Sequence, residues 1–454
     1  MSTETPVVTT TDNRPEPLRE KGWLINRNFT LLSVGQGISN MGDFVYSTTL
    51  LIWVFTLGGS AAAVSGVLVA QALPMFVLGP IAGVFVDRWH RLRTMLTSDL
   101  ARAVIALLPL LAPEPLRLPA IYTSVLLISA ISCFFNPARS AVIQVIVSEQ
   151  DQPQAASLGQ VTFALSFIIG PVLASSLYFL VGPVIAISIN AASYAVSALC
   201  LWHMRVPMAD LLPSAFKGKT GSLEHEEELS GIAAILHELQ AGFGFVWKTR
   251  VLLVITILVL IGMLGAGAIN ALDIIFVTQR LHASANLYGY LSAAGGLGML
   301  AGAVLAGLLA KRIQARRMLA GSLILLGLGL SIYALQTWFV IALVFNALLC
   351  MTQGGLEVAF GPLLMSVTPR RLMGRVQSVI NTAMFGASLF SSVLAGFLGG
   401  LFPVYMILFG GGLLIALAGL FGWLALPAPV SAPMLQEKAE LVDEVEKVPV
   451  VVNV

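Results

Sequence analysis

Long apolar runs dominate this 454-residue chain, and short polar segments separate them between residues 28 and 426. About 20 apolar residues cover the hydrocarbon core of a bilayer. Backbone groups in lipid must pair within their own segment, so runs of this length form helices. The pattern predicts twelve spans, at 28–57, 61–86, 95–112, 118–146, 157–180, 182–204, 250–278, 286–310, 317–336, 338–366, 376–400 and 402–426.

Composition agrees with this pattern, because 57% of the residues are apolar and only 11% are charged. A soluble domain carries roughly 25% charged residues. A chain of this length with so few charges cannot build a fully hydrated surface, so much of its surface faces lipid. We expect an all-α polytopic membrane protein whose first span also serves as the insertion signal.

Basic residues are distributed unevenly between the two sets of loops. All but Arg117 and Arg280 of the 25 lysines and arginines fall on the even-numbered loops, on the two tails or in spans near that face. Basic residues near span ends stay in the cytoplasm. The asymmetry predicts an even number of spans and both termini in the cytoplasm. Together with the family resemblance given below, it predicts a multi-pass protein of a bacterial inner (cell) membrane.

The chain has an internal repeat. Residues 79–83 recur as 303–307, and Asn136-Pro137 recurs at nearly the same offset as Gly361-Pro362. The interruption between the sixth and seventh spans contains a run from Leu229 to Trp247 with helical apolar spacing, which predicts an amphipathic helix at the membrane interface. We therefore expect two six-helix pseudo-symmetric halves, with a substrate site between them. The regions are 1–27 (cytoplasmic tail), 28–204 (first half), 205–249 (cytoplasmic linker), 250–426 (second half) and 427–454 (acidic cytoplasmic tail).

The loop between the second and third spans carries the sharpest motif, formed by Gly83, Asp87, Arg88, Arg91 and Arg93. It resembles the signature loop of the major facilitator superfamily, Gly-x-x-x-Asp-Arg-x-Gly-Arg-Arg/Lys, with His90 at the second Gly and Leu92 at the last basic position. The resemblance implies twelve spans. It also implies that the carboxylate of Asp87 lies beside the start of span eleven and latches the cytoplasmic side. Gly83 would allow close helix packing, and Arg88 and Arg91 would pair with Asp99, Glu149 or Asp151. Alternatively, the arginines only set topology.

Three further stretches are similar to the bacterial macrolide-efflux and siderophore-exporter branch of that superfamily. They are Asn28-Phe29, residues 137–141 and Gly374-Arg375. Gly170-Pro171 in span five resembles the start of the antiporter motif Gly-Pro-x-x-Gly-Gly, and an ordinary proline kink is the alternative. The resemblance implies export.

Charges inside spans are the main functional candidates, since a carboxylate at a helix centre costs roughly 2.5–3.5 kcal/mol on insertion scales. Asp43 lies at the centre of span one and shares a face with Gln36 and Asn40. We expect this face to line a water-filled cavity and Asp43 to exchange the coupling proton, or else to be a buried structural carboxyl. Glu357, one turn after Gln353, is a second proton or cation site, or is structural.

Other polar groups in spans are weaker candidates. Asp273 is expected at the rim of span seven, and Asp99 and Arg102 are expected to form a structural i,i+3 pair. Further cavity-lining candidates are the asparagines Asn136, Asn270 and Asn381, together with Asn190 and Asn346, although a buried Asn often only bridges helices.

Other chemistry is not expected. The three cysteines lie within spans, and Gly218-Lys219-Thr220 lacks the glycine that a phosphate-binding loop needs at position 213. We expect no enzyme, catalytic residue, metal, nucleotide, nucleic acid or cofactor, and energy from a proton gradient. The prediction is a monomeric exporter of amphipathic small molecules, embedded in a lipid bilayer and working by proton antiport. The alternatives are a lysophospholipid-like or uptake transporter and a non-transporting membrane receptor of the same fold.

Overall fold

The structure, a computed structural model, describes residues 24–86, 88–206, 243–310, 312–369 and 372–425. In this part of the chain, twelve helical segments are long and apolar enough to cross a membrane, as the sequence predicts. The first half contains α1 (Arg27–Gly58), α2 (Ala61–Val86), α3 (Arg91–Ala106) with α4 (Leu108–Leu111), η1 (Glu114–Leu116), α5 (Arg117–Ile146), α6 (Gln152–Val181) and α7 (Pro183–Trp202).

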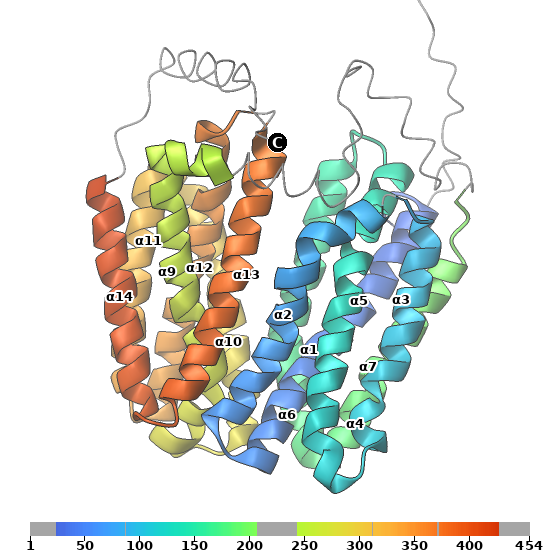
Figure 1. Cartoon of the computed structure of the whole chain (residues 1–454), viewed down its shortest axis with the longest axis horizontal. Coiled ribbons are helices and arrows are strands. Elements are labelled where there is room, and N and C mark those ends of the chain that lie inside the picture. The colour runs from blue at the N-terminus through green and yellow to red at the C-terminus, as the bar shows by residue number, and fades with distance from the viewer. Residues whose placement is uncertain (1–23, 87, 207–242, 311, 370–371, 426–454) are drawn as a thin grey trace, which may run out of the picture.

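The second half repeats this order. It contains α9 (Arg250–Ile275), which continues into the π-helical turn η4 (Phe276–Arg280), then η5 (Ala285–Leu287), α10 (Tyr288–Leu309), α11 (Ala315–Leu335), α12 (Phe339–Val367), α13 (Met373–Leu398) and α14 (Val404–Ala425). Figure 1 shows the two halves side by side, with the first residue of α1 and the last residue of α14 at the same end. We call this the terminal end, and the opposite one the far end.

The third and fifth spans begin earlier than hydropathy predicts, at Arg91 and Gln152. His90 caps α3, because its Nδ1 accepts the backbone N–H of Arg93 at 3.3 Å. Pro153 in the first turn of α6 has a backbone conformation suited to a helix start. These polar first turns extend beyond the hydrocarbon, so an apolar window misses them.

Contacts between helices are repeated in the two halves. In the first half α1 packs against α6 and α7, and α5 packs against α2 and α3. The equivalent pairs of the second half are α9 with α13 and α14, and α12 with α10 and α11. The two main contacts between the halves, α2 with α13 and α10 with α6, are also exchanged by this pseudo-symmetry. The repeat seen in the sequence is therefore a repeat of helix packing.

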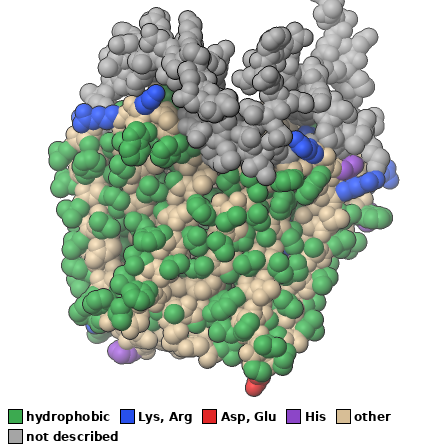
Figure 2. Space-filling view, viewed as in Figure 1, with side chains coloured by type: hydrophobic (Ala, Val, Ile, Leu, Met, Phe, Trp, Pro, Cys, Tyr) green, Lys and Arg blue, Asp and Glu red, His purple; other side chains and the backbone are tan. Residues whose placement is uncertain are grey.

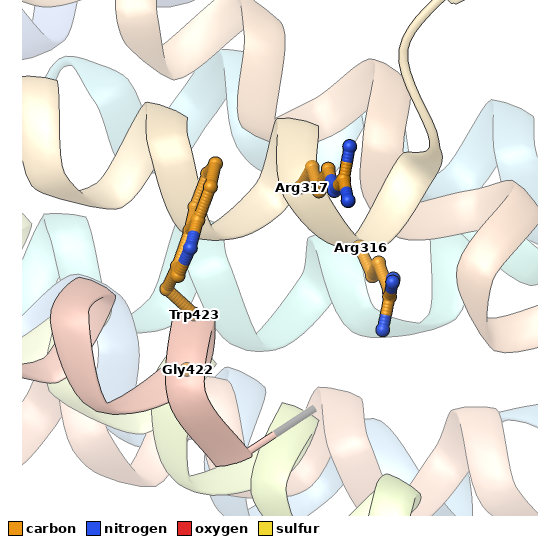
Figure 3. A pocket seen from close by; sticks show the side chains of 4 residues that line it. All are labelled: Arg316, Arg317, Gly422 and Trp423. Atoms are coloured by element: carbon orange, nitrogen blue, oxygen red, sulfur yellow. The ribbon is translucent and has the colours of Figure 1, made fainter. Parts of the chain in front are cut away.

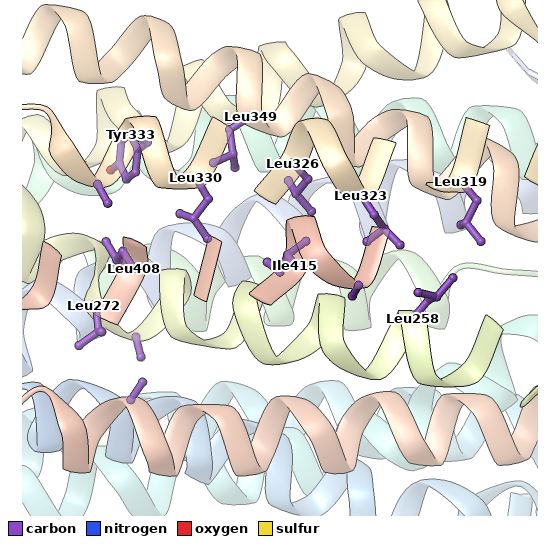
Figure 4. Packing of buried hydrophobic residues seen from close by; sticks show 14 of the residues in the cluster. Leu258, Leu272, Leu319, Leu323, Leu326, Leu330, Tyr333, Leu349, Leu408 and Ile415 are labelled. Atoms are coloured by element: carbon purple, nitrogen blue, oxygen red, sulfur yellow. The ribbon is translucent and has the colours of Figure 1, made fainter. Parts of the chain in front are cut away.

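Leucines and other large apolar side chains fill each half. Figure 4 shows Leu258 and Leu272 of α9 facing Leu323 and Leu330 of α11, with Ile415 of α14 among them. Figure 2 shows hydrophobic side chains over the flank of the molecule and lysines or arginines gathered at the terminal end. This distribution is the one expected of a bundle surrounded by lipid.

The expected amphipathic linker helix is only partly within the described residues, because 207–242 lie outside them. Residues 243–248 are helical. Phe243 and Trp247 are exposed and stack with their ring centroids 5.8 Å apart, whereas Val246 is buried against the second half. This short segment thus has one apolar face on the bundle and one aromatic face outward.

Glycine packing shows at which end the halves touch. A Cβ added at Gly289, at the start of α10, would lie 2.3 Å from the carbonyl oxygen of Pro171 on α6. One added at Gly396, near the end of α13, would lie 2.7 Å from Ser65 Cβ on α2. At the terminal end, a Cβ at Gly83 or Gly374 would meet nothing within 4 Å. In this conformation the halves are therefore joined most tightly at the far end.

Candidate transport site

Small residues bring α1 and α7 into close contact. A Cβ added at Gly42 would lie 2.2 Å from Ser193 Oγ, and one added at Gly35 would lie 3.0 Å from Cys200 Cβ. Between them Gln36 is only 8% exposed, and its Nε2 donates to Ser197 Oγ at 3.2 Å. The expectation that Gln36 lines a water-filled cavity is wrong, because its face of α1 packs against α7. Asn40 on the same face is half-buried.

Asp43, one helical turn beyond Asn40, is the carboxyl group at the centre of α1. The hydroxyl of Tyr194 on α7 donates a hydrogen bond to Asp43 Oδ1. Tyr194 is fully buried, whereas Asp43 keeps an exposed edge. Asp43 therefore lies at the edge of a buried polar network, and part of its side chain remains accessible.

The buried network continues from Tyr194 into α3. The Arg102 guanidinium carbon lies 4.7 Å from the centroid of the Tyr194 ring and 4.2 Å from that of Phe135 on α5. Arg102 also forms an ion pair with Asp99, which is fully buried. The expected i,i+3 pair is thus present, and it reaches Asp43 through Tyr194. Arg102 therefore lies close to two carboxyl groups, those of Asp99 and Asp43.

The second half holds a buried carboxyl group that the sequence placed wrongly. Asp273 is expected at an exposed rim, yet it is only 7% exposed, and the Tyr333 hydroxyl donates to its Oδ1 at 2.5 Å. Tyr333 comes from α11, and its ring packs on Phe276 with the centroids 4.7 Å apart. The π-helical turn that starts at Phe276 follows Asp273 within three residues, and such turns are frequent at functional sites.

Several predicted cavity residues remain accessible. Glu357 on α12 is exposed, and Gln353 one turn before it is half-buried. Exposed asparagines lie on three other helices, namely Asn136 on α5, Asn270 on α9 and Asn381 on α13. The Asn381 side-chain oxygen accepts from Gln377 Nε2 at 3.0 Å. Polar groups exposed within spans are stable where they face water rather than hydrocarbon.

Two further asparagines are buried in helix contacts instead. Asn346 on α12 is buried and donates to the backbone oxygen of Leu291 on α10 at 2.8 Å. Asn190 on α7 is fully buried, and its backbone oxygen accepts from Ser193 Oγ at 2.8 Å. Neither of these side chains lines an accessible surface, so the cavity expectation is wrong for both.

The signature loop lies at the terminal end. Arg91 is 5% exposed, Arg88 and Arg93 are exposed, and Asp87 lies outside the described residues. Asp99 is bonded by Arg102 rather than left available to Arg88. Gly83 makes no close helix contact in this conformation, so its predicted packing role is not realised here.

Gly170-Pro171 lies in α6 where this helix contacts α1 of its own half and α10 of the other half. A Cβ added at Gly170 would lie 2.4 Å from Phe44 Cβ on α1. The Pro171 carbonyl faces Gly289 on α10, and the backbone N–H of Gly289 donates to Ser175 Oγ at 3.0 Å. The motif is therefore part of the far-end contact between the halves.

Sequence reasoning missed Tyr194, although a signal was present. Asn190, Ser193, Tyr194 and Ser197 form a polar stripe at helical spacing within an apolar span. Such a stripe predicts a polar helix contact. It does not identify α1 as the partner, because Tyr194 and Asp43 are far apart in the chain.

Known proteins are similar to this chain in sequence and in fold. The model of a family described as transmembrane secretion effector matches residues 22–451. The chain belongs to this family of the major facilitator superfamily. It is 23% identical over 417 residues to the MFS-type transporter YkuC of Bacillus subtilis, covering 88% of this chain and 93% of YkuC. It is 25% identical to macrolide efflux protein A of Streptococcus pyogenes, over 73% of this chain and 78% of that protein.

Solved structures show the same fold. The nucleoside transporter NupG superposes with a TM-score of 0.68 at 13% identity, covering 87% of this chain and 99% of that structure. Family and fold together make this major facilitator protein a multi-pass membrane transporter of small molecules, and not an enzyme.

Proposed function

We propose that this transporter exports amphipathic small molecules from the cytoplasm by proton antiport with alternating access. Macrolide efflux protein A, a relative over most of the chain, is named for the efflux of macrolides. Among the described residues, Glu357 is an acidic side chain that is exposed in the middle of a span. A mostly apolar surface suits bulky, weakly polar substrates better than sugars or phosphates.

The observation that carries the proposal is the hydrogen bond from Tyr194 to a partly exposed Asp43, in front of the buried Arg102–Asp99 pair. A carboxyl with one accessible edge can exchange a proton with water. Its neutral and ionised forms interact differently with Tyr194 and with the Arg102 charge behind it. Proton binding at Asp43 would therefore bias the packing of α1 against α7.

Coupling to one proton is energetically sufficient. One charge moved through 100 mV is worth about 2.3 kcal/mol. Since about 1.4 kcal/mol corresponds to a tenfold ratio, one proton supports a substrate gradient on the order of fiftyfold. No nucleotide or other cofactor is needed.

The two ends would open in turn. We place the termini in the cytoplasm, because nearly all basic residues lie at their end. The far-end contacts at Gly289 and Gly396 then close the outer side in the present conformation. In the opposite state, Asp87 would approach the start of α13 and close the cytoplasmic side.

Growth tests address this function. Cells that express the chain, the Asp43→Asn variant or an empty vector are grown on a panel of amphipathic toxic compounds. The proposal expects the wild-type chain alone to raise tolerance, and expects a protonophore to remove the difference in compound accumulation. A difference in compound accumulation that persists with protonophore would contradict proton coupling. No shift for any compound would contradict drug export and favour a lysophospholipid-like substrate, uptake or a receptor role.

A further inference from the structure

A pocket of about 120 Å³ opens at the terminal end between the first turn of α11 and the last turn of α14. It is lined by Arg316, Arg317, Gly422 and Trp423 (Figure 3). Gly422 allows α14 to approach α9, since a Cβ there would lie 2.6 Å from Leu258 Cδ1. The Trp423 indole reaches α11, where its Cζ3 lies 3.8 Å from the position of a Cβ at Gly321.

The charged side chains that line this pocket, those of Arg316 and Arg317, are both basic. Among the described residues of the second half, the acidic side chains are Asp273 and Glu357, and both lie within spans. Arg316 donates from Nε to Gln314 Oε1 at 3.0 Å, which holds its side chain beside the pocket. Arg317 is exposed.

The repeat in the sequence explains this imbalance. The first-half loop carries a carboxylate, Asp87, after Gly83, and the equivalent position after Gly307 is Lys311. The second-half loop has thus kept the basic residues of the motif and lost its acidic one. The latch role proposed for Asp87 therefore does not account for Arg316 and Arg317.

The position of the pocket suits a lipid headgroup. Arg316 and Arg317 lie in the first turn of a span, where helix N–H groups lack internal partners and the helix dipole favours an anion. Trp423 is 50% exposed in the last turn of another span, the level at which tryptophan sits between hydrocarbon and headgroups. Charge and aromatic surface are therefore combined at the depth of a phosphodiester.

We propose that this pocket binds the headgroup of an anionic phospholipid. The phosphate lies against the Arg316 and Arg317 guanidinium groups, and Trp423 packs beside the first carbons of the lipid. Guanidinium groups recognise phosphate with directed hydrogen bonds. A bound lipid joins α11 to α14, so it stabilises the second half and not the contact between halves.

The test uses the full-length protein purified in detergent and titrated with short-chain phosphatidylglycerol or phosphatidylcholine, with thermal unfolding and native mass spectrometry as readouts. We expect phosphatidylglycerol to raise the unfolding temperature and to remain bound, and phosphatidylcholine to do neither. In the double variant R316Q/R317Q the affinity should fall by about 30-fold, since each basic residue near an anionic surface is worth about 1 kcal/mol.

Matched variants separate this site from general charge attraction. R312Q removes an exposed arginine of the same loop that does not line the pocket, and it should leave the affinity unchanged. R316K/R317K should retain most of the binding, and this variant keeps the test valid if the glutamine variant unfolds. Equal binding of both lipids, or an equal loss in R312Q, would overturn the proposal.

Two other anions serve as competing probes. Inorganic phosphate at the same concentration tests for a free-anion site, and a peptide of residues 434–447 tests whether the acidic tail of the chain is the ligand. Stabilisation by either probe equal to that by phosphatidylglycerol, and lost in R316Q/R317Q, would overturn the lipid proposal. Failure of both probes supports it.

Discussion

The Tyr194 hydroxyl donates a hydrogen bond to the Asp43 carboxyl, across the contact between α7 and α1. Tyr194 is buried and Asp43 is partly exposed, so the bond joins an accessible carboxyl to an enclosed polar network. The ring of Tyr194 also lies beside the Arg102 guanidinium. A change of charge at Asp43 would therefore act directly on side chains of α7 and α3.

Tyr194→Phe removes this donor and keeps the ring. A hydrogen bond to a charged group contributes about 1.5–3 kcal/mol, so we expect gradient-driven efflux in proteoliposomes to fall about tenfold or more. Tyr178→Phe is the matched control, because the Tyr178 hydroxyl also pairs with an α1 side chain, Thr56 Oγ1 at 2.8 Å, away from Asp43. Equal losses in the two variants would argue against a special role for Tyr194.

Arg102→Gln leaves Asp99 buried without its cation. Breaking a buried ion pair on one side costs about 3–5 kcal/mol, so we expect a clearly lower unfolding temperature in detergent. The double variant Asp99→Asn with Arg102→Gln should recover much of that loss. Arg117→Gln, which breaks an ion pair with the exposed Glu114, should cost less than about 1 kcal/mol. A comparable loss in the Arg117 variant would contradict this assignment.

Gly289→Val places a side chain against Pro171 and Ser175 at the far-end contact. We expect the halves to separate there and a cysteine introduced at position 65 to react faster with a membrane-impermeant maleimide. Gly307→Val is the control, because a Cβ at Gly307 meets nothing within 4 Å. Unchanged labelling in the Gly289 variant would show that this contact does not close the far end.

Tyr333→Phe removes the donor to Asp273 and leaves a buried carboxyl without it. We expect a loss of about 1–3 kcal/mol in stability, the cost of an unsatisfied buried polar group. Combining it with Asp273→Leu, which removes the carboxyl as well, should reduce the loss. Thermal unfolding of Tyr333→Phe, Asp273→Leu and the double variant measures the difference, and an additive loss would mean that the two residues act independently.

The helices could be predicted from the sequence because long apolar runs and the loop charges act locally. The starts of α3 and α6 could not, since the cap at His90 and the first turn around Pro153 are polar. The internal repeat was visible in two short motifs, and the structure repeats it in helix contacts.

The candidate site was predictable only in part. The carboxyl at Asp43 stands out in an apolar run, whereas its partner on α7 depends on how the helices pack. The polar face of α1 predicts a cavity at Gln36, but in the structure Gln36 meets the hydroxyl of Ser197 on α7. The position of Asp273 in its span predicts a rim, whereas its burial depends on the contact with Tyr333 of α11, which lies far away in the sequence.

The central claim is that Asp43 carries the coupling proton, and transport by purified Asp43→Asn in proteoliposomes tests it most directly. Asn resembles the neutral carboxyl and cannot release a proton. The account predicts that substrate exchange without a gradient continues, while transport driven by an imposed proton gradient is lost. Glu114→Gln, a change in an exposed loop, should retain both activities. Undiminished gradient-driven transport by Asp43→Asn would contradict the account.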